Sequence, residues 1–128
     1  HKFVEANKDN AAIKEFVEPL AALNKEWGDL TMQIGMRAMQ NPDEVGAAAV
    51  DYLYFAGYIT LAYLWARMAL VAQEKLAAGT TDVDFYNAKV TTARFYFKKI
   101  LPRVRSHVDV IAGGLDPLMA LDAEHFAF

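Results

Sequence analysis

The chain has 128 residues, of which 55% are hydrophobic and 23% charged, so it can form one domain with a hydrophobic core and is neither disordered nor of low complexity. Its formal net charge of −3 argues against a protein that coats nucleic acid. Cysteine is absent and serine occurs once, which excludes disulfides, thiolate metal sites and most nucleophilic catalysis.

The first long helix is predicted over residues 10–40. Apolar side chains recur there every three or four residues, which is the spacing of one face of an α-helix. Pro19 lies inside this stripe and removes a backbone donor, so we expect either a kink or a helix that restarts with Pro19 in its first turn. The residues before Lys8 are expected to form a short helical piece. The stripe consists of Ile13, Phe16, Leu20, Leu23, Trp27, Leu30, Ile34 and Ala38.

The segment QNPDEV, residues 40–45, predicts the end of the first helix and the start of the second. Asn41 suits the N-cap position and Pro42 the first helical position. Asp43 and Glu44 then fall in the first turn, where the helix dipole favours anions. The second helix is therefore expected to begin at this point.

The second helix is expected to end in the segment KLAAGTTD, with Gly79 as its C-terminal cap and Asp82 as the N-cap of the third helix. The third helix is predicted from Val83 to Ala112. Pro102 should bend this helix near Lys98, because proline cannot donate the hydrogen bond to that carbonyl. The segment GGLDP ends it, and the closing LMALDAEHFAF is expected to add one or two helical turns.

No stretch alternates apolar and polar residues between turn signals, so no sheet is expected. Short connections make consecutive helices antiparallel. The sequence therefore predicts an all-α, up-and-down antiparallel helical bundle, with three long helices and short terminal helical segments, similar to a four-helix bundle. Residues 1–128 are expected to form a single domain. Because the chain starts with His1 and not Met, we expect a fragment, a processed product or the remnant of a tag, and the fragment of a longer protein is favoured. The lack of an apolar leader and of cysteine favours a cytoplasmic protein.

The segment DYLYFAGYITLAYLWARMALVAQ, residues 51–73, has only one charged residue between Tyr52 and Ala72, which is Arg67. It is long enough to span a membrane. However, its aromatic residues are spread along it and its neighbours are amphipathic, so we expect no membrane span. A helix that is apolar nearly all round is otherwise buried on most sides. Either it is only the core of the bundle, or part of it also docks on another domain or subunit. If Arg67 is buried there, it needs a carboxylate partner.

Two groups of side chains are candidates for such docking. Tyrosines and a tryptophan lie on the second helix, and the segment ARFYFKKILPRVR of the third carries five cations and no acid. Aromatic residues mixed with arginine are enriched at protein interfaces, and they also suit the phosphates and ring of a nucleotide tail such as that of coenzyme A. A solvated basic face is the third possibility. The predicted interface residues are Tyr54, Tyr58, Trp65, Phe95, Lys98, Lys99 and Arg103.

No catalytic, cofactor-binding or metal site is predicted in this sequence. Ser106 and His107 are adjacent, and adjacent helical side chains point about 100° apart, so they are a poor nucleophile and base pair. The three histidines form neither an H-E-x-x-H nor an E-x-x-H motif. Asp122 and His125 could hydrogen-bond within one helical turn, but two ligands make a weak metal site.

Three segments resemble, in order and spacing, the extra C-terminal helical domain of the larger flavin-dependent acyl-CoA dehydrogenases, including the type that acts on 3-methylmercaptopropionyl-CoA. The segments are DYLYFAGYITLAYLWARMALVAQEKL, DVDFYNAKVTTARFYFKKILPRV and LMALDAEHF. The likeness extends from about Phe16 to Phe126. Relatives often open the third helix with Asp-Pro, where this chain has Asp82 and Val83; this change leaves the N-cap residue intact.

The resemblance implies a parent enzyme that oxidises an acyl-CoA thioester to its 2,3-enoyl form, with FAD accepting the β-hydrogen as hydride. It places the flavin, the thioester pocket and the catalytic glutamate in preceding domains, and no residue here matches that glutamate. The chain is then an accessory domain that packs on the catalytic body or a neighbouring subunit of a homo-oligomer. One alternative is an independent, non-enzymatic helical module that dimerises through the second helix or the basic face of the third. A membrane-associated bundle is the third possibility.

Overall fold

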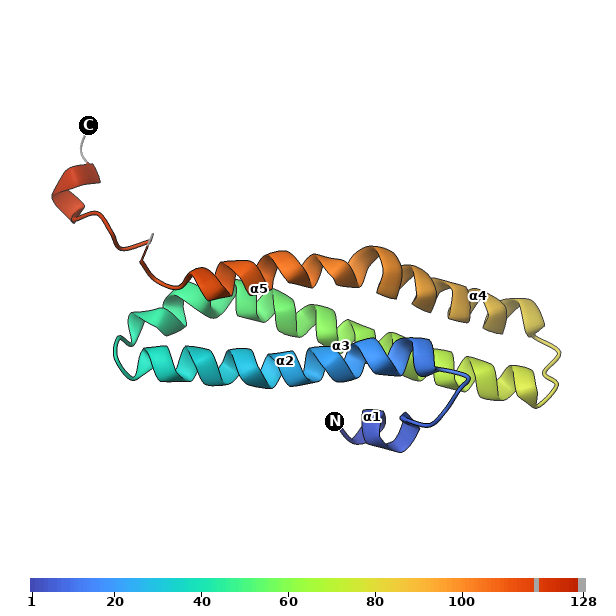
Figure 1. Ribbon diagram of the computed structural model, residues 1–128. Coiled ribbons are helices and arrows are strands. Elements are labelled where there is room, and N and C mark those ends of the chain that lie inside the picture. Colours follow the sequence, from blue (N-terminus) through green and yellow to red (C-terminus); the bar gives the residue numbers. More distant parts are fainter. Residues whose placement is uncertain (117, 127–128) are drawn as a thin grey trace.

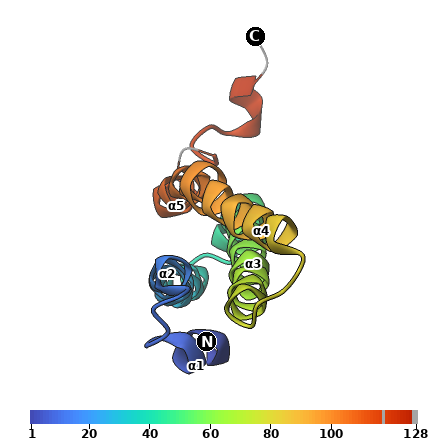
Figure 2. The same cartoon turned by 90° about the vertical axis from the view of Figure 1, so that its right-hand side faces the viewer.

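The computed structural model describes residues 1–116 and 118–126, and every regular element in these ranges is helical (Figure 1). Three long rods lie side by side: α2 (Lys14–Ala38), α3 (Asp43–Ala77), and a rod that begins with α4 (Val83–Phe95) and ends with α5 (Val104–Gly113). A short helix, α1 (Lys2–Asn7), lies against α2 and α3. Figure 2 shows the rods at the corners of a triangle, with α3 in contact with both others. The predicted all-α, up-and-down bundle is confirmed.

Helix α3 begins at Asp43, one residue later than predicted, with Pro42 at the N-cap position, but the Asn41 side chain still satisfies a backbone donor of the first turn. The Asp43 N–H donates to the Asn41 side-chain oxygen at 3.1 Å, and the acidic first turn follows. Its end also agrees, because Gly79 has a φ of +78° and its N–H donates to the Leu76 carbonyl at 3.1 Å. The Thr80 N–H reaches back to Lys75 at 3.2 Å, which completes a Schellman motif. The cap of α3 therefore needs a residue that tolerates positive φ.

Asp82 occupies the N-cap position of α4, but its side chain makes no capping hydrogen bond. Its N–H instead donates to the Thr80 hydroxyl at 3.2 Å. The prediction of a restart at Pro19 was wrong. Helix α2 begins at Lys14 and continues through Pro19, since a proline removes only the one hydrogen bond to the Glu15 carbonyl.

The third rod changes its winding where Pro102 was predicted to distort it. Five residues, Tyr96–Ile100, form a π-helical turn, and Leu101–Arg103 form a 3₁₀ turn before α5 begins. Pro102 has no N–H to donate to the Lys98 carbonyl, and the wide π turn absorbs that missing bond. The prediction was a bend near Lys98; what the structure shows at this position is a local change of helix type.

The core lies where the three rods meet. Phe55, Ala62, Ala66 and Ala69 of α3 are fully buried, and the alanines let the neighbouring rods approach closely. Large apolar side chains from the other rods fill the remaining space. The buried residues outside α3 include Ile13, Phe16, Val17, Leu20, Leu30, Val90, Leu101, Val104 and Ile111.

At one end of the bundle, Arg37 of α2 closes the last turn of α5. Its guanidinium donates to the Ile111 carbonyl at 3.0 Å and to the Ala112 carbonyl at 3.4 Å. Beyond Gly114 the chain leaves the bundle (Figure 1), and Ala123–Phe126 form a 3₁₀ turn, which confirms the predicted helical turn in the tail. The apolar side chains Leu118, Met119, Leu121 and Phe126 of this tail are exposed.

Candidate interaction surface

His107 has a structural role in the bundle. Its Nδ1 lies 2.8 Å from the Asp51 carboxylate, and its ring stacks on Tyr54 at 5.3 Å and contacts Tyr58 at 5.7 Å. The Ser106 hydroxyl donates to the Arg103 carbonyl at 2.9 Å. In the part of the chain that the structure describes, no three His, Cys, Asp or Glu side chains are close enough to hold a metal. His107 thus joins α3 to α5.

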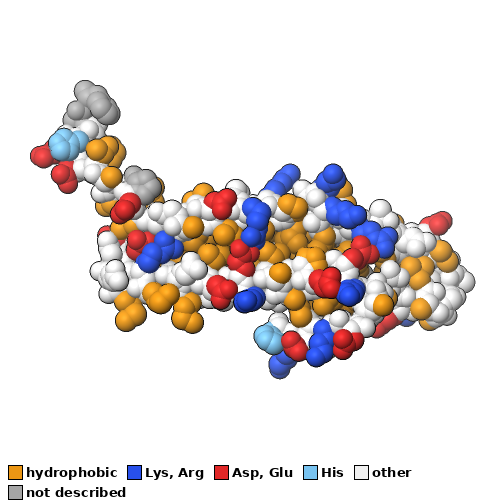
Figure 3. Space-filling model, in the orientation of Figure 1, with side chains coloured by type: hydrophobic (Ala, Val, Ile, Leu, Met, Phe, Trp, Pro, Cys, Tyr) orange, Lys and Arg blue, Asp and Glu red, His pale blue; other side chains and the backbone are white. Residues whose placement is uncertain are grey.

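The seven predicted interface residues differ in exposure. Tyr54 and Phe95 are each 57% exposed, and the three cations Lys98, Lys99 and Arg103 are also exposed. Tyr58 and Trp65 are half-buried and pack against the core, so they offer less area to a partner than Tyr54 and Phe95. Figure 3 shows Lys and Arg side chains gathered at the upper edge, over the middle of the third rod. The aromatic and basic residues therefore stay a predicted interface.

The basic segment divides into paired and unpaired cations. Arg94 donates to Glu15 Oε1 from Nη2 at 2.7 Å and from Nε at 2.9 Å, and Nε also reaches Oε2 at 3.1 Å. Arg105 makes a bidentate contact with both carboxylate oxygens of Glu26. The hydrogen bonds to these carboxylates raise the pKa of both guanidinium groups. The ion pairs connect α2 to the third rod along the seam seen in Figure 3. Among the described residues, Lys98, Lys99 and Arg103 form no ion pair, so these three remain available to a partner.

Arg67 is exposed, so the condition under which it would need a carboxylate partner is not met. Its side chain lies on the surface of α3, with the guanidinium 5.6 Å from the centre of the Tyr63 ring and 3.3 Å from its hydroxyl. A carboxylate partner is unnecessary because water reaches the charge, and the ring supplies a cation–π contact.

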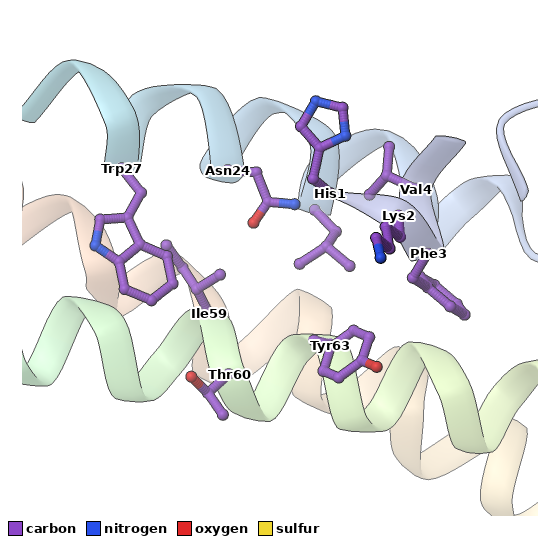
Figure 4. Close-up of a pocket in the computed structure, with 10 residues that line it drawn as sticks. His1, Lys2, Phe3, Val4, Asn24, Trp27, Ile59, Thr60 and Tyr63 are labelled. Carbon is purple, nitrogen blue, oxygen red and sulfur yellow. The ribbon is translucent and has the colours of Figure 1, made fainter. Parts of the chain in front are cut away.

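A groove of about 410 Å³ lies between α1, α2 and α3 (Figure 4). The Phe3 ring meets Tyr63 edge-on at 5.6 Å, and Trp27 lies farther along the same groove. The Trp27 Nε1–H donates to the Tyr52 hydroxyl at 2.7 Å, which leaves its polar atom satisfied. Asn24 and Thr60 are the uncharged polar side chains of the lining. The groove therefore offers apolar area but few groups that could hydrogen-bond to a ligand.

Two further hollows flank α3 and are almost wholly apolar. One of about 560 Å³ lies beside its first half, against Ile34 of α2. The other, of about 470 Å³, lies beside its second half, where Phe85 of α4 carries Lys89 5.0 Å above its ring. Among the described residues, no glycine-rich loop lines either hollow, and no set of donors converges there to hold two phosphates. Neither hollow therefore fits a dinucleotide such as FAD.

Helix α3 is also long and apolar enough to cross a membrane, by length and composition only. It contacts α2 on one side and α4 and α5 on the other, but only 33% of its apolar stretch is buried in this bundle. The central helices of helical bundles pass the same composition test.

Residues 1–122 match the family described as acetyl-CoA dehydrogenase C-terminal like. The chain belongs to this family. The acetyl-CoA dehydrogenase C-terminal like domain is also 35% identical to part of the broad-specificity linear acyl-CoA dehydrogenase FadE5 of Mycobacterium tuberculosis. That match covers 98% of this domain and 22% of the relative, so the domain spans about a fifth of the relative's length. The resemblance to acyl-CoA dehydrogenases is thereby confirmed at the level of the family.

Proposed function

We propose that the chain is the C-terminal accessory domain of a flavin-dependent acyl-CoA dehydrogenase that converts an acyl-CoA thioester to its 2,3-enoyl product. The family match over residues 1–122 carries this proposal. In this proposal the flavin, the acyl-CoA and the catalytic base lie in preceding domains, as the family resemblance implies. When bound, FAD would accept the β-hydrogen there as hydride.

The role proposed for this domain is to pack on the catalytic body or a neighbouring subunit of a cytoplasmic homo-oligomer, without spanning a membrane. Exposed aromatic residues and unpaired cations on one rod support this role. Tyr54 and Phe95 supply apolar area, and Lys98, Lys99 and Arg103 supply charge that no carboxylate of the described chain neutralises.

The acyl-CoA that the parent enzyme oxidises is a separate and more specific proposal. The relative is named for linear acyl-CoA substrates, whereas the resemblance noted in the sequence includes the type that acts on 3-methylmercaptopropionyl-CoA. Both substrates are unbranched acyl thioesters with an α-proton and a β-hydrogen. The same active site could therefore accept either, and a direct comparison decides between them.

The test is to express the native reading frame with everything upstream of residue 1 and to record its visible spectrum. We expect flavin absorbance that bleaches when an acyl-CoA is added without oxygen. Free coenzyme A, which lacks the acyl chain, is the control and should leave the spectrum unchanged. A colourless protein, or a reading frame of about this size, would reject the enzyme and favour the independent dimerising module.

A second role, contact with the phosphates of coenzyme A, is favoured by the three exposed and unpaired cations. Replacing Lys98, Lys99 and Arg103 with glutamine in the parent should then raise the Michaelis constant for the acyl-CoA and leave kcat unchanged. The matched control is Lys25→Gln, an exposed cation on α2. Unchanged Michaelis constants in the triple variant would rule this role out.

A further inference from the structure

The hollow beside the second half of α3 has two apolar walls, which come from consecutive helices. On α3, Leu64, Met68 and Val71 lie four and then three residues apart, so they share one helical face. On α4, Phe85 and Tyr86 form the other wall, with their rings edge-on at 5.2 Å. The three α3 side chains and Phe85 are between 37% and 56% exposed. The walls therefore bound an open space of about 470 Å³, a size typical of small-molecule sites.

Two cations complete the lining of this hollow, one on each wall. On α3 the Arg67 guanidinium lies 5.6 Å from the centre of the Tyr63 ring. On α4 the Lys89 ammonium group lies 5.0 Å from the centre of the Phe85 ring. Among the described residues, neither cation forms an ion pair and no carboxylate lines the hollow. The hollow thus combines apolar walls with a positive charge that the described chain does not neutralise.

The polar atoms of the lining side chains are almost all donors. Arg67 and Lys89 have only N–H groups, and one of these donates to the Tyr63 hydroxyl at 3.3 Å. The Tyr86 hydroxyl is the remaining polar group of the lining. An extended peptide would bring N–H donors, and the lining side chains offer them only the Tyr86 oxygen. The hollow instead suits a ligand that has an apolar body and an anionic end that accepts hydrogen bonds.

We propose that the hollow between α3 and α4 binds the anion of a straight-chain carboxylic acid. Its alkyl chain lies between the aliphatic wall of α3 and the rings of α4, where it covers exposed apolar area. Its carboxylate accepts hydrogen bonds from Arg67 and Lys89. An ionised carboxylate only accepts, and its two oxygens match the planar fork of a guanidinium group.

This proposal goes beyond the function proposed above and does not depend on it. The ligand binds to residues of this chain, so its test needs neither flavin nor acyl-CoA. A parent protein without flavin chemistry would leave the carboxylate site standing. A chain that does not bind the carboxylate would leave the enzyme assignment standing.

The first experiment titrates the 128-residue chain with octanoate, decanoate and dodecanoate by isothermal titration calorimetry, below the concentrations at which they form micelles. We expect one saturable site whose Kd falls about three- to fourfold for each added methylene. Decyl maltoside, which has the chain of decanoate and a neutral head, should bind at least tenfold more weakly than decanoate. Equal affinities of these two would contradict the role of the cations.

The second experiment changes the lining of the hollow. Arg67→Gln and Lys89→Gln should each raise the Kd of dodecanoate about two- to fivefold, and the double variant about tenfold. Lys25→Gln, at an exposed cation of α2, is their control. Val71→Glu places a carboxylate in the α3 wall and should abolish binding, whereas Val50→Glu, at an exposed valine of the same helix, should not. Circular dichroism checks that each variant keeps its helices.

Methionine methyl groups locate the bound ligand independently. The chain has five methionines, and Met68 is the one that lines this hollow. In protein labelled with ¹³C at the methionine methyl groups, dodecanoate should shift the nuclear magnetic resonance signal of Met68 and leave the other four in place. Met68→Leu identifies that signal with little change of volume.

Three results would overturn the proposal. One is a folded chain with no saturable binding of dodecanoate, as expected if another domain of the parent fills this hollow. Another is binding that shifts a different methionine signal and leaves that of Met68 unchanged. The third is a chain that binds phosphatidylglycerol vesicles but not dissolved dodecanoate, which would make the hollow part of a membrane-binding surface.

Discussion

Tyr96 connects the π turn of the third rod to α3, and removing its hydroxyl tests how much this connection stabilises the fold. The side chain is 7% exposed, and its hydroxyl donates to the Tyr58 carbonyl at 2.9 Å. Burial, with a smaller effect of the nearby Tyr58, raises the pKa of Tyr96 to about 12. Tyr96→Phe keeps the ring and removes only the hydroxyl, so it separates the hydrogen bond from the packing.

At neutral pH the variant should lose about 1 kcal/mol in the free energy of unfolding, the net value of one such hydrogen bond. Alkali reverses this difference. In the unfolded chain the pKa of a tyrosine is about 10, so between pH 10 and 12 the unfolded wild type ionises while the folded wild type keeps its proton. Stability that is fully present below pH 10 is therefore lost as the pH rises, by about 1.4 kcal/mol at pH 11.

The assay is urea denaturation of both proteins, followed by circular dichroism from pH 7 to pH 11. Lysines and the other tyrosines titrate in both proteins, so only the difference between the two reports on Tyr96. We expect this difference to fall from about 1 kcal/mol at pH 7 and to change sign, to about −0.4 kcal/mol, at pH 11. A difference that stays constant over this range would show that folding does not raise the pKa of Tyr96, and would refute the reasoning.

Three other perturbations have defined outcomes. Phe55→Ala leaves a cavity at a fully buried site and should cost about 3–5 kcal/mol in thermal or urea denaturation; a cost below about 1 kcal/mol would mean that the site collapses. A double-mutant cycle of Glu15→Gln and Arg94→Gln should give a coupling of only about 0.2–1 kcal/mol, reduced by salt, because both side chains are more than a third exposed. Gly79→Ala should lower the free energy of unfolding by about 1 kcal/mol or more, because Gly79 has a φ of +78°. Gly57→Ala should raise it by about 1 kcal/mol, because Gly57 lies inside a helix with open space at its Cβ. Equal effects of the two substitutions would contradict this difference in backbone conformation.

The helices could be predicted because their signals are local. Asn41 and Gly79 act within a few residues of their own positions, so their capping roles were predictable from the sequence. Pro102 likewise distorts the turn before it, although the form of the distortion, a π turn followed by a 3₁₀ turn, depends on packing. Pro19 shows the limit of such rules, since the packing of α2 outweighs the loss of one hydrogen bond.

The candidate surface was less predictable because it depends on contacts between distant segments. Arg94 and Lys98 belong to the same basic run in the sequence, but only Arg94 meets a carboxylate, and that carboxylate is Glu15, on another helix. Periodicity likewise could not show that Tyr58 is half-buried while Tyr54 is exposed. Which residues of an apolar helix face solvent is set by the angle at which its neighbours pack.

Arg37 ends α5 with donors from a different helix, so the last turn is completed by tertiary contact and not by the residues that follow. The bundle therefore has its boundary at Gly114. Proteolytic removal of the segment after Gly114, or fusion of a tag or another domain there, should leave the amides of α5 as protected from hydrogen exchange as in the whole chain. Arg37→Ala should instead expose the amides of that last turn to exchange, even with the tail in place.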